Sequence, residues 1–448
     1  MERVVIMGAA GRDFHDFNTV YRNDPSTEVV AFTRAATQNV GETRGGRGRE
    51  MDRYPASLAG EGYPDGVPIV PEADLESVVA EEDVDRVVFS YSDVSHETVM
   101  HAASRALSEG ADFHVHGPDA MMLDVDVPVL AIDAVRTGCG KSQVSRAFAD
   151  ELRERGVQAV VVREPMPYGD LTERRVQRFE TMADLDEARA TIEEREEYEQ
   201  HIERGHVVYA GVDYVELFAR AQQEADLLVW DGGNNELPFV RPTVHVVLAD
   251  PLRAGDEVRY HPGETNLRIA DYVLVNKENS ADQEGIDTVV ENARSVNPDA
   301  EILHADSVVT VDDPDRVQGA RVLVVEDGPT LTHGGASYGA GTVAATEYGA
   351  AERVDPRGAA VGEIADVLDR YPHLDAVLPA MGYSDEQLAD LEATIRNVDC
   401  DLVLAGTPHD LARQVDVDVP VVRVRYRTEP KGWSFADLLD RHAAELNV

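Results

Sequence analysis

The stretch from Val129 to Ser142 reads VLAIDAVRTGCGKS, and it decides the fold of the chain. Val129–Asp133 is a short apolar run typical of a buried strand, and a helical pattern begins at Lys141-Ser142. A strand, a glycine-containing loop, Lys-Ser and a helix in this order predict a phosphate-binding P-loop. Glycines let backbone N–H groups turn inward, and the helix N-terminus adds positive partial charge.

The residues of this loop have separate expected roles. Lys141 is expected to reach the β- and γ-phosphates of a nucleotide, and the Ser142 hydroxyl is expected to bind Mg²⁺. The usual first glycine of the pattern falls at Val135, so we expect a variant loop. The remaining predicted nucleotide-binding residues of the loop are Thr137, Gly138, Cys139 and Gly140.

The composition describes an acidic globular protein. The chain has 448 residues, 43% of them hydrophobic, and a net charge of -44. Of the 41 basic residues only Lys141, Lys277 and Lys431 are lysines. An acidic, lysine-poor chain with an ordinary apolar fraction suggests a halophilic protein adapted to high salt, and it argues against nucleic-acid binding. We also expect a cytoplasmic protein, because two cysteines make no disulfide framework and no long apolar run is present.

Strands that alternate with helices predict three α/β units with mostly parallel sheets and a central P-loop domain. The expected domains are a Rossmann-like unit at 1–127, the nucleotide-binding unit at 128–305 and a substrate-binding unit at 306–448. The first unit carries Gly8 and Gly11 in a turn that could bind a dinucleotide or another anion, or could simply be tight. It also carries an arginine-rich stretch at 41–53, for which we favour an anion-binding lid over a mobile loop.

Two later strands of the central unit end in polar residues. Asp226–Trp230 is followed by Asp231, the position of the Walker B carboxylate that holds Mg²⁺ directly or through water. Another strand ends in Asn276-Lys277, a pair typical of base recognition in P-loop proteins. GTP-selective proteins add Asp two residues after this lysine, and Asn279 stands there instead, which favours ATP and leaves GTP as the alternative. This order of elements resembles the P-loop class that includes dethiobiotin synthetase and MinD-type ATPases.

Between these strands lies a charged stretch at 182–203, which we interpret as a solvated helix with ion pairs along its surface. The third unit adds a long glycine-rich loop after the strand Arg321–Val325. Such a loop suits a phosphorylated ligand, because it exposes many backbone N–H groups.

Five motifs together resemble the cyclic 2,3-diphosphoglycerate synthetase family, along essentially the whole chain. They are PMPYGDL (165–171), DGGNN (231–235), EDGPTLTHGG (326–335), AMGYS (380–384) and GTPHDL (406–411). The resemblance implies an enzyme that uses ATP and Mg²⁺ to close a phosphoanhydride within 2,3-diphosphoglycerate, with release of ADP and phosphate.

A substrate with two phosphates and a carboxylate needs a pocket rich in positive charge and in backbone N–H groups. The substrate-binding candidates are Arg163, Arg178, Asp327, Gly334 and Gly335. Asp170 and His333 are the candidates for moving a proton, and Lys141 and Asp231 complete the expected catalytic set.

Two other functions stay open at this point. The chain could be a regulatory or maturation GTPase, or a related ligase that acts on a different phosphorylated small acid. A sensor that binds a dinucleotide through Gly8–Asp13 ranks last, because it leaves the P-loop unexplained. In each enzyme reading we expect a small phosphorylated substrate, no membrane or nucleic-acid partner, and a homo-oligomer, most simply a dimer.

Overall fold

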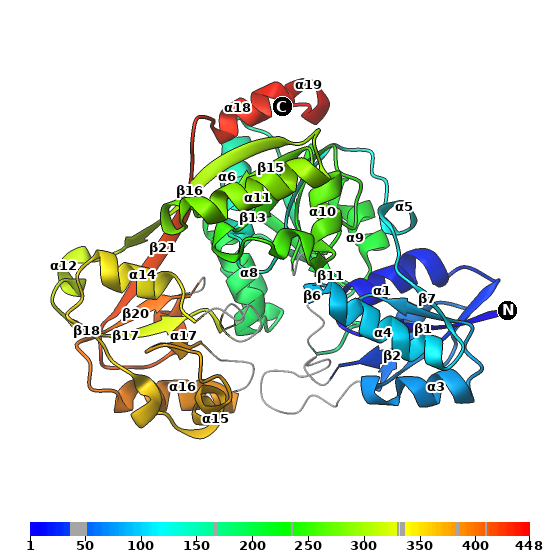
Figure 1. The fold of residues 1–448 in the computed structure, drawn as a ribbon, viewed down its shortest axis with the longest axis horizontal. Coiled ribbons are helices and arrows are strands. Elements are labelled where there is room, and N and C mark those ends of the chain that lie inside the picture. Colours follow the sequence, from blue (N-terminus) through cyan, green and yellow to red (C-terminus); the bar gives the residue numbers. More distant parts are fainter. Residues whose placement is uncertain are drawn as a thin grey trace.

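The structure is a computed structural model of the chain (Figure 1). It describes residues 1–35, 52–164, 169–233, 236–328, 331, 337–380, 385–407 and 410–448. Figure 1 shows an N-terminal unit on one side, the P-loop unit in the middle and a C-terminal unit on the other side. Strands alternate with helices in each, and most strand pairs are parallel, which confirms the predicted α/β fold class.

The N-terminal unit is built on a six-stranded sheet of order β3-β4-β2-β1-β5-β7. Its strands are β1 (Glu2–Met7), β2 (Thr27–Arg34), β3 (Arg53–Tyr54), β4 (Val67–Pro71), β5 (Arg86–Phe89) and β7 (Asp112–His114). Apolar residues of β1 and β5 are buried between helices, among them α1 (Arg12–Asp16), α3 (Leu75–Glu81) and α4 (His96–Ser108). A two-stranded ribbon of β6 (Val94–Ser95) and β14 (Tyr260–His261) links this unit to the P-loop unit.

One sheet of thirteen strands runs through the rest of the chain. Its order is β10-β11-β9-β12-β8-β13-β15-β16-β21-β20-β17-β18, with β19 also paired to β17. The strands of the P-loop half are β8 (Val129–Ala134), β9 (Ala159–Arg163), β10 (Val176–Phe179), β11 (Val207–Gly211), β12 (Leu227–Asp231), β13 (Val244–Ala249) and β15 (Tyr272–Val275). Those of the C-terminal half are β17 (Arg321–Glu326), β18 (Glu352–Arg353), β19 (Leu378–Pro379), β20 (Leu402–Gly406) and β21 (Val421–Pro430).

The strand β16 (Glu301–Val311) joins the two halves of this sheet. Its first residues pair in parallel with β15, and from Ala305 onward it pairs antiparallel with β21. The predicted boundary between residues 305 and 306 therefore falls inside one strand. The C-terminal helices α18 (Phe435–Arg441) and α19 (Ala443–Leu446) return to the P-loop half, where the Phe435 ring lies 4.9 Å from that of Phe148.

Helices cover the P-loop half and bury its apolar strands. They are α6 (Lys141–Glu154), α7 (Met182–Glu187), α8 (Ile192–Glu203), α9 (Tyr214–Ala221), α10 (Gly263–Ile269) and α11 (Gln283–Val296). Leu130 and Ile132 of β8 pack in one core with Phe148 and Leu152 of α6. Full burial of each such side chain contributes about 1.5–3 kcal/mol. This packing fixes where α6 begins relative to the strand ends.

Two expectations from the sequence are wrong in detail. The charged stretch at 182–203 forms two helices, α7 and α8, because residues 188–191 end one helix and Thr191 caps the next. Its second half is also largely buried, contrary to the solvated helix expected.

Candidate functional site

The P-loop has the predicted course. The chain leaves β8, and Gly138 and Gly140 adopt left-handed φ values of 84° and 100° before α6 begins at Lys141. A Cβ on Gly140 would lie 2.4 Å from Nδ2 of Asn276, so both the backbone conformation and the space require glycine there. The Val135 carbonyl lies against Gly263, where a Cβ would approach its oxygen to 2.1 Å.

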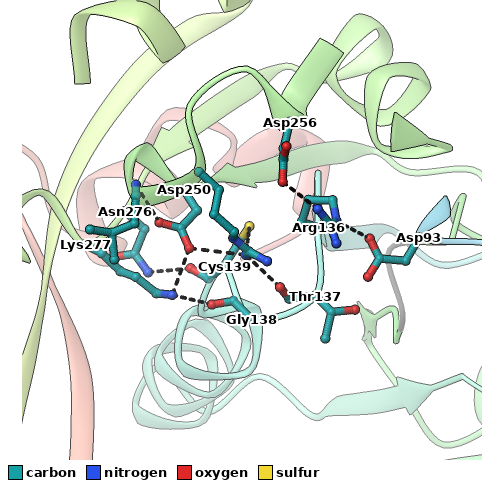
Figure 2. A network of polar contacts seen from close by, with 11 residues as sticks. Asp93, Arg136, Thr137, Gly138, Cys139, Asp250, Asp256, Asn276 and Lys277 are labelled. Carbon is teal, nitrogen blue, oxygen red and sulfur yellow. Dashed lines mark hydrogen bonds and ion pairs between the residues drawn. The ribbon is translucent and has the colours of Figure 1, made fainter. Parts of the chain in front are cut away.

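Three side chains hold successive P-loop carbonyls from outside, and we call Arg253, Asn276 and Lys277 the carbonyl clamp (Figure 2). Arg253 donates to the Thr137 carbonyl at 2.7 Å, Asn276 donates to that of Cys139 at 2.9 Å, and Lys277 donates to that of Gly138. Because the carbonyls are held on one side, the N–H groups of the loop are left for an anion on the other.

Asp250 anchors this clamp. It lies at the end of β13 and accepts from Lys277 at 2.9 Å and from Arg253 at 3.2 Å. Figure 2 shows the Asp250 carboxylate bound to Lys277, which in turn reaches Gly138 of the loop. The structure thus places the predicted Asn276-Lys277 pair at the P-loop, with an additional role in shaping the loop.

Arg136 connects the P-loop to the neighbouring segments. It pairs with Asp93 at 2.6 Å and with Asp256 at 2.5 Å, and its guanidinium lies 3.6 Å from the centre of the Tyr260 ring. Asp93 belongs to the N-terminal unit, so this arginine ties that unit directly to the loop (Figure 2).

Asp231 is the centre of the buried charges beside the P-loop. One carboxylate oxygen accepts from Lys141 at 2.9 Å, and the other lies 2.7 Å from Arg163 and 3.2 Å from Nε2 of His201. Burial alone would raise the pKa of Asp231, but Arg163 and Lys141 outweigh it and hold the pKa well below its usual range. Three predicted site residues therefore meet here, because Lys141 and Arg163 both contact the ionised carboxylate of Asp231.

His201 and its neighbours on α8 were missed by the sequence reasoning. Burial lowers the pKa of His201 to about 4, so its ring is neutral at pH 7. Glu197 of the same helix pairs with Arg163. Arg195 pairs with Glu199 at 3.0 Å, and Arg174 pairs with Glu194. The dense Glu/Arg composition of this stretch was a visible signal, but such composition is far more common on solvated helices.

Other predicted site residues lie apart from this cluster. Asp170 is exposed and accepts from the backbone N–H and the hydroxyl of Thr172 at 2.8 and 2.6 Å. Arg178 lies on the edge strand β10 and pairs with Glu224 and Glu180. Asp327 follows β17 and is half-buried. The predicted His333, Gly334 and Gly335 lie outside the described residues.

The Gly8–Asp13 turn is closed by its own acidic residue. The Asp13 carboxylate accepts from the backbone N–H groups of Ala10, Gly11 and Phe14. A Cβ on Gly8 would lie 2.5 Å from it. The turn therefore supplies its N–H groups to an internal carboxylate, which favours the tight-turn interpretation. Of the arginine-rich stretch at 41–53, the structure describes Arg53, which donates to the Asp65 and Gly66 carbonyls, while Arg44, Arg47 and Arg49 lie outside the described residues.

The chemistry of the predicted metal ligands suits Mg²⁺ only in part. Asp231 is ionised. Ser142 directly follows Lys141 as the second residue of α6 and supplies a hydroxyl oxygen. Oxygen donors of this kind are those that Mg²⁺ prefers. The Lys141 ammonium group donates a hydrogen bond to one Asp231 oxygen. A metal ion would fit at that oxygen once the ammonium group binds a phosphate instead. In the parts of the chain that the structure describes, no cluster of three or more His, Cys, Asp or Glu side chains forms a metal site by itself.

Comparisons with known proteins give one extensive match. No family model matches the chain. The arginine synthetase ArcE of Thermococcus kodakarensis is 54% identical over 431 residues, which cover 96% of this chain and 94% of that protein. Among solved structures, LpxK from Aquifex aeolicus in complex with ATP shares 10% identity with a TM-score of 0.39, over 78% of this chain and 95% of that one. A murein peptide ligase from Psychrobacter arcticus shares 12% identity with a TM-score of 0.26, over 69% and 58%. Within the described residues no helix is both long and apolar enough to span a bilayer.

Proposed function

The chain belongs to the family of the arginine synthetase ArcE, and from this premise we propose that it forms arginine in an ATP-dependent ligation. Membership in this family makes the chain an enzyme, an ATP-dependent ligase, as the sequence predicted. The single observation that carries the substrate assignment is the identity of 54% along nearly the full length of both proteins.

The chemistry of the site supports this proposal. An ATP-dependent route to a guanidinium group starts from a ureido group, and citrulline is the ureido compound that leads to arginine. The γ-phosphoryl group would pass to the ureido oxygen and release ADP. Ammonia would then attack the ureido carbon, phosphate would leave with the oxygen, and the nitrogen would lose a proton. Phosphoryl transfer of this kind depends mainly on positioning and charge neutralisation.

The residues around the P-loop have clear parts in such a reaction. The loop N–H groups and Lys141 would hold the β- and γ-phosphates. When Lys141 moves from Asp231 to the phosphate, Arg163 and His201 would remain as the partners of Asp231. Mg²⁺, bound by Ser142 and Asp231, would neutralise charge on the phosphates. Arg163 would keep Asp231 ionised during these changes.

A second candidate comes from the five motifs quoted above. Their resemblance to the cyclic 2,3-diphosphoglycerate synthetase family favours closure of a phosphoanhydride within 2,3-diphosphoglycerate. That substrate carries several negative charges and needs several unpaired cations. In the described part of the site Arg163 is already paired with Asp231 and Glu197, which favours the amino-acid substrate.

One assay separates these functions. The protein is incubated in molar KCl with ATP and Mg²⁺, and either citrulline with ammonium or 2,3-diphosphoglycerate is added. We expect arginine and ADP in equal amounts from the first mixture, and ATP from arginine, ADP and phosphate in the reverse direction. A cyclic product by ³¹P NMR with no arginine would support the second candidate instead. Nucleotide hydrolysis indifferent to both substrates and faster with GTP would support a regulatory GTPase.

We also propose that the enzyme is a cytoplasmic homodimer that binds no nucleic acid. Light scattering at molar KCl tests the oligomeric state. The strongly acidic composition supports the absence of nucleic-acid binding, because phosphate backbones repel such a surface.

A further inference from the structure

Arg146 is a buried cation that has no partner in the structure described. It lies on α6 and is 4% exposed. Two other buried arginines of the P-loop half are paired: Arg163 with Asp231 and Glu197, and Arg195 with Glu199. Among the described residues, none accepts a hydrogen bond from Arg146 or forms an ion pair with it. Burial of an unpaired charge costs several kcal/mol, so such a group points to an anion that binds there.

Arg146 lies where α6 meets three other elements of the fold. Burial lowers its pKa, and the groups that act on it electrostatically are Tyr426, Arg204, Asp231 and Glu197. These come from β21, the end of α8, β12 and α8 itself. Because α6 packs against β21, where the Thr428 hydroxyl donates to Oε1 of Gln143 at 3.4 Å, Arg146 lies at the seam between the P-loop half and the C-terminal half of the large sheet.

The position of Arg146 on α6 relates it to the phosphate site. It follows Lys141 by five residues, a rise of about 7.5 Å along the helix. Long side chains on a helix lean toward its N-terminus, which directs Arg146 back toward the P-loop.

Tyr426 adds a second polar group to this seam. Burial raises the pKa of its hydroxyl, which therefore stays a neutral donor. The charges that act on Tyr426 are those of Arg146, Asp327, Glu197 and Glu196. One guanidinium with carboxylates close by suits a group that carries both an anion and an ammonium ion, as an α-amino acid does.

We propose that Arg146 binds the α-carboxylate of the amino-acid substrate, with Tyr426 beside it and Asp327 near the α-ammonium group. This assignment rests on the proposed arginine-forming function and adds the part of the site that recognises the end of the substrate remote from the reaction. It makes Arg146 a specificity residue that touches the substrate and leaves the nucleotide to the P-loop.

The test compares arginine with agmatine, which lacks the carboxylate, in the ATP-forming direction. We expect wild type to favour arginine by about 100-fold or more in kcat/KM, because a missing charged partner leaves Arg146 unpaired. In Arg146→Met this preference should fall below about tenfold, through a higher KM for arginine and little change for agmatine. Arg146→Lys keeps the charge without the fork and should lie between the two.

Arg155→Ala is the matched control, because Arg155 lies at the end of the same helix and pairs with Glu151 and Asp440. It should leave the preference unchanged. Arg146→Met should also raise the Tm, since it removes an unpaired buried charge. An unchanged arginine preference in Arg146→Met, or an equal loss for both substrates with a lower Tm, would overturn the assignment. Failure of the proposed function is distinct, since wild type would then use neither compound.

Discussion

Asn276 Nδ2 donates to the carbonyl of Cys139 at 2.9 Å, and so joins the end of β15 to the turn of the P-loop. The bond fixes the orientation of one peptide plane beside Gly140. The base-recognition role expected from the sequence and the loop-shaping role seen in the contacts make different predictions for nucleotide binding.

Asn276→Ala should weaken the binding of ATP, GTP and inorganic tripolyphosphate by a similar factor of about tenfold, the cost of one lost buried hydrogen bond. Isothermal titration with the three ligands measures it. If Asn276 acts on the base instead, binding of tripolyphosphate will stay as in wild type while ATP binding falls. Asn397→Ala is a suitable control, since Asn397 donates to the Ala359 carbonyl in the C-terminal unit, away from the clamp.

Lys141→Ala should abolish turnover and leave the protein folded. Asp231 would keep Arg163 and His201 as partners, so its charge stays compensated. We expect a loss of at least about 1,000-fold in kcat, as is usual when a phosphate-binding cation is removed from the transition state. ADP release in the coupled assay measures the effect. Lys431→Ala is the control, because that lysine is exposed and pairs with Glu278 and Asp306. Full activity in Lys141→Ala would refute the P-loop interpretation.

Gly263→Ala should distort the P-loop from outside. The new Cβ would lie 2.1 Å from the Val135 carbonyl oxygen, so either α10 or the loop must shift. We expect weaker ATP binding and a loss of about 1–3 kcal/mol of stability, as for overpacking elsewhere. Gly117→Ala is the control, because no atom lies within 4 Å of a Cβ there. Equal behaviour of the two variants in urea unfolding and ATP titration would contradict the close contact described.

Four buried histidines should make a contribution to stability that is lost as the pH falls from about 6.5 to 4. Burial lowers the pKa of His15, His116 and His201 to about 4, and that of His261 to about 3. Each therefore takes up a proton on unfolding in this range, and its contribution to stability falls as the pH falls. Each histidine contributes at most about 3–5 kcal/mol over its full titration.

Asp13 acts in the opposite direction over the same range. Burial raises its pKa to about 6, so its contribution to stability grows as the pH falls from about 6 to 4. Burial also raises the pKa of four other carboxyls, Asp16, Glu194, Glu236 and Glu326, which act in the same direction as Asp13. The contribution of a histidine is therefore measured as the difference in slope between wild type and a histidine variant. Urea unfolding at pH 7, 6, 5 and 4 measures it. His15→Phe, which keeps the ring stacked on Phe239, should reduce the slope by nearly one proton, with exposed His101→Gln as the substitution control. Equal slopes in wild type and His15→Phe would refute the buried, neutral state of His15.

Several parts of the site could be predicted from the sequence because local rules determine them. The P-loop follows from a buried strand, glycines at left-handed positions and a helix that begins at Lys141. Asp231 follows from its place at the end of an apolar strand. These features depend on residues close together in the chain, and the described contacts bring Lys141, Arg163 and Asp231 together.

The rest depends on contacts between distant segments. The burial of α8 depends on Arg163 and Asp231, which supply partners for its charges, and nothing in residues 192–203 alone distinguishes this from a solvated helix. Likewise β16 contains His304, Asp306 and Ser307, whose polarity hides a strand that only its pairing with β15 and β21 stabilises. Arg146 is an unremarkable residue of an amphipathic helix until β21 covers it.

The strand β16 has a mechanical consequence for the catalytic cycle. Because its two ends belong to different halves of one hydrogen-bonded sheet, the C-terminal half has no free linker about which to swing. Any approach of that half to the bound nucleotide must be a twist of the whole sheet, spread over many small changes in strand angle. Strain applied at the proposed amino-acid end of the seam would therefore be transmitted through continuous backbone to the P-loop end. A gene cut at residue 305 would yield two fragments that each lack half a strand.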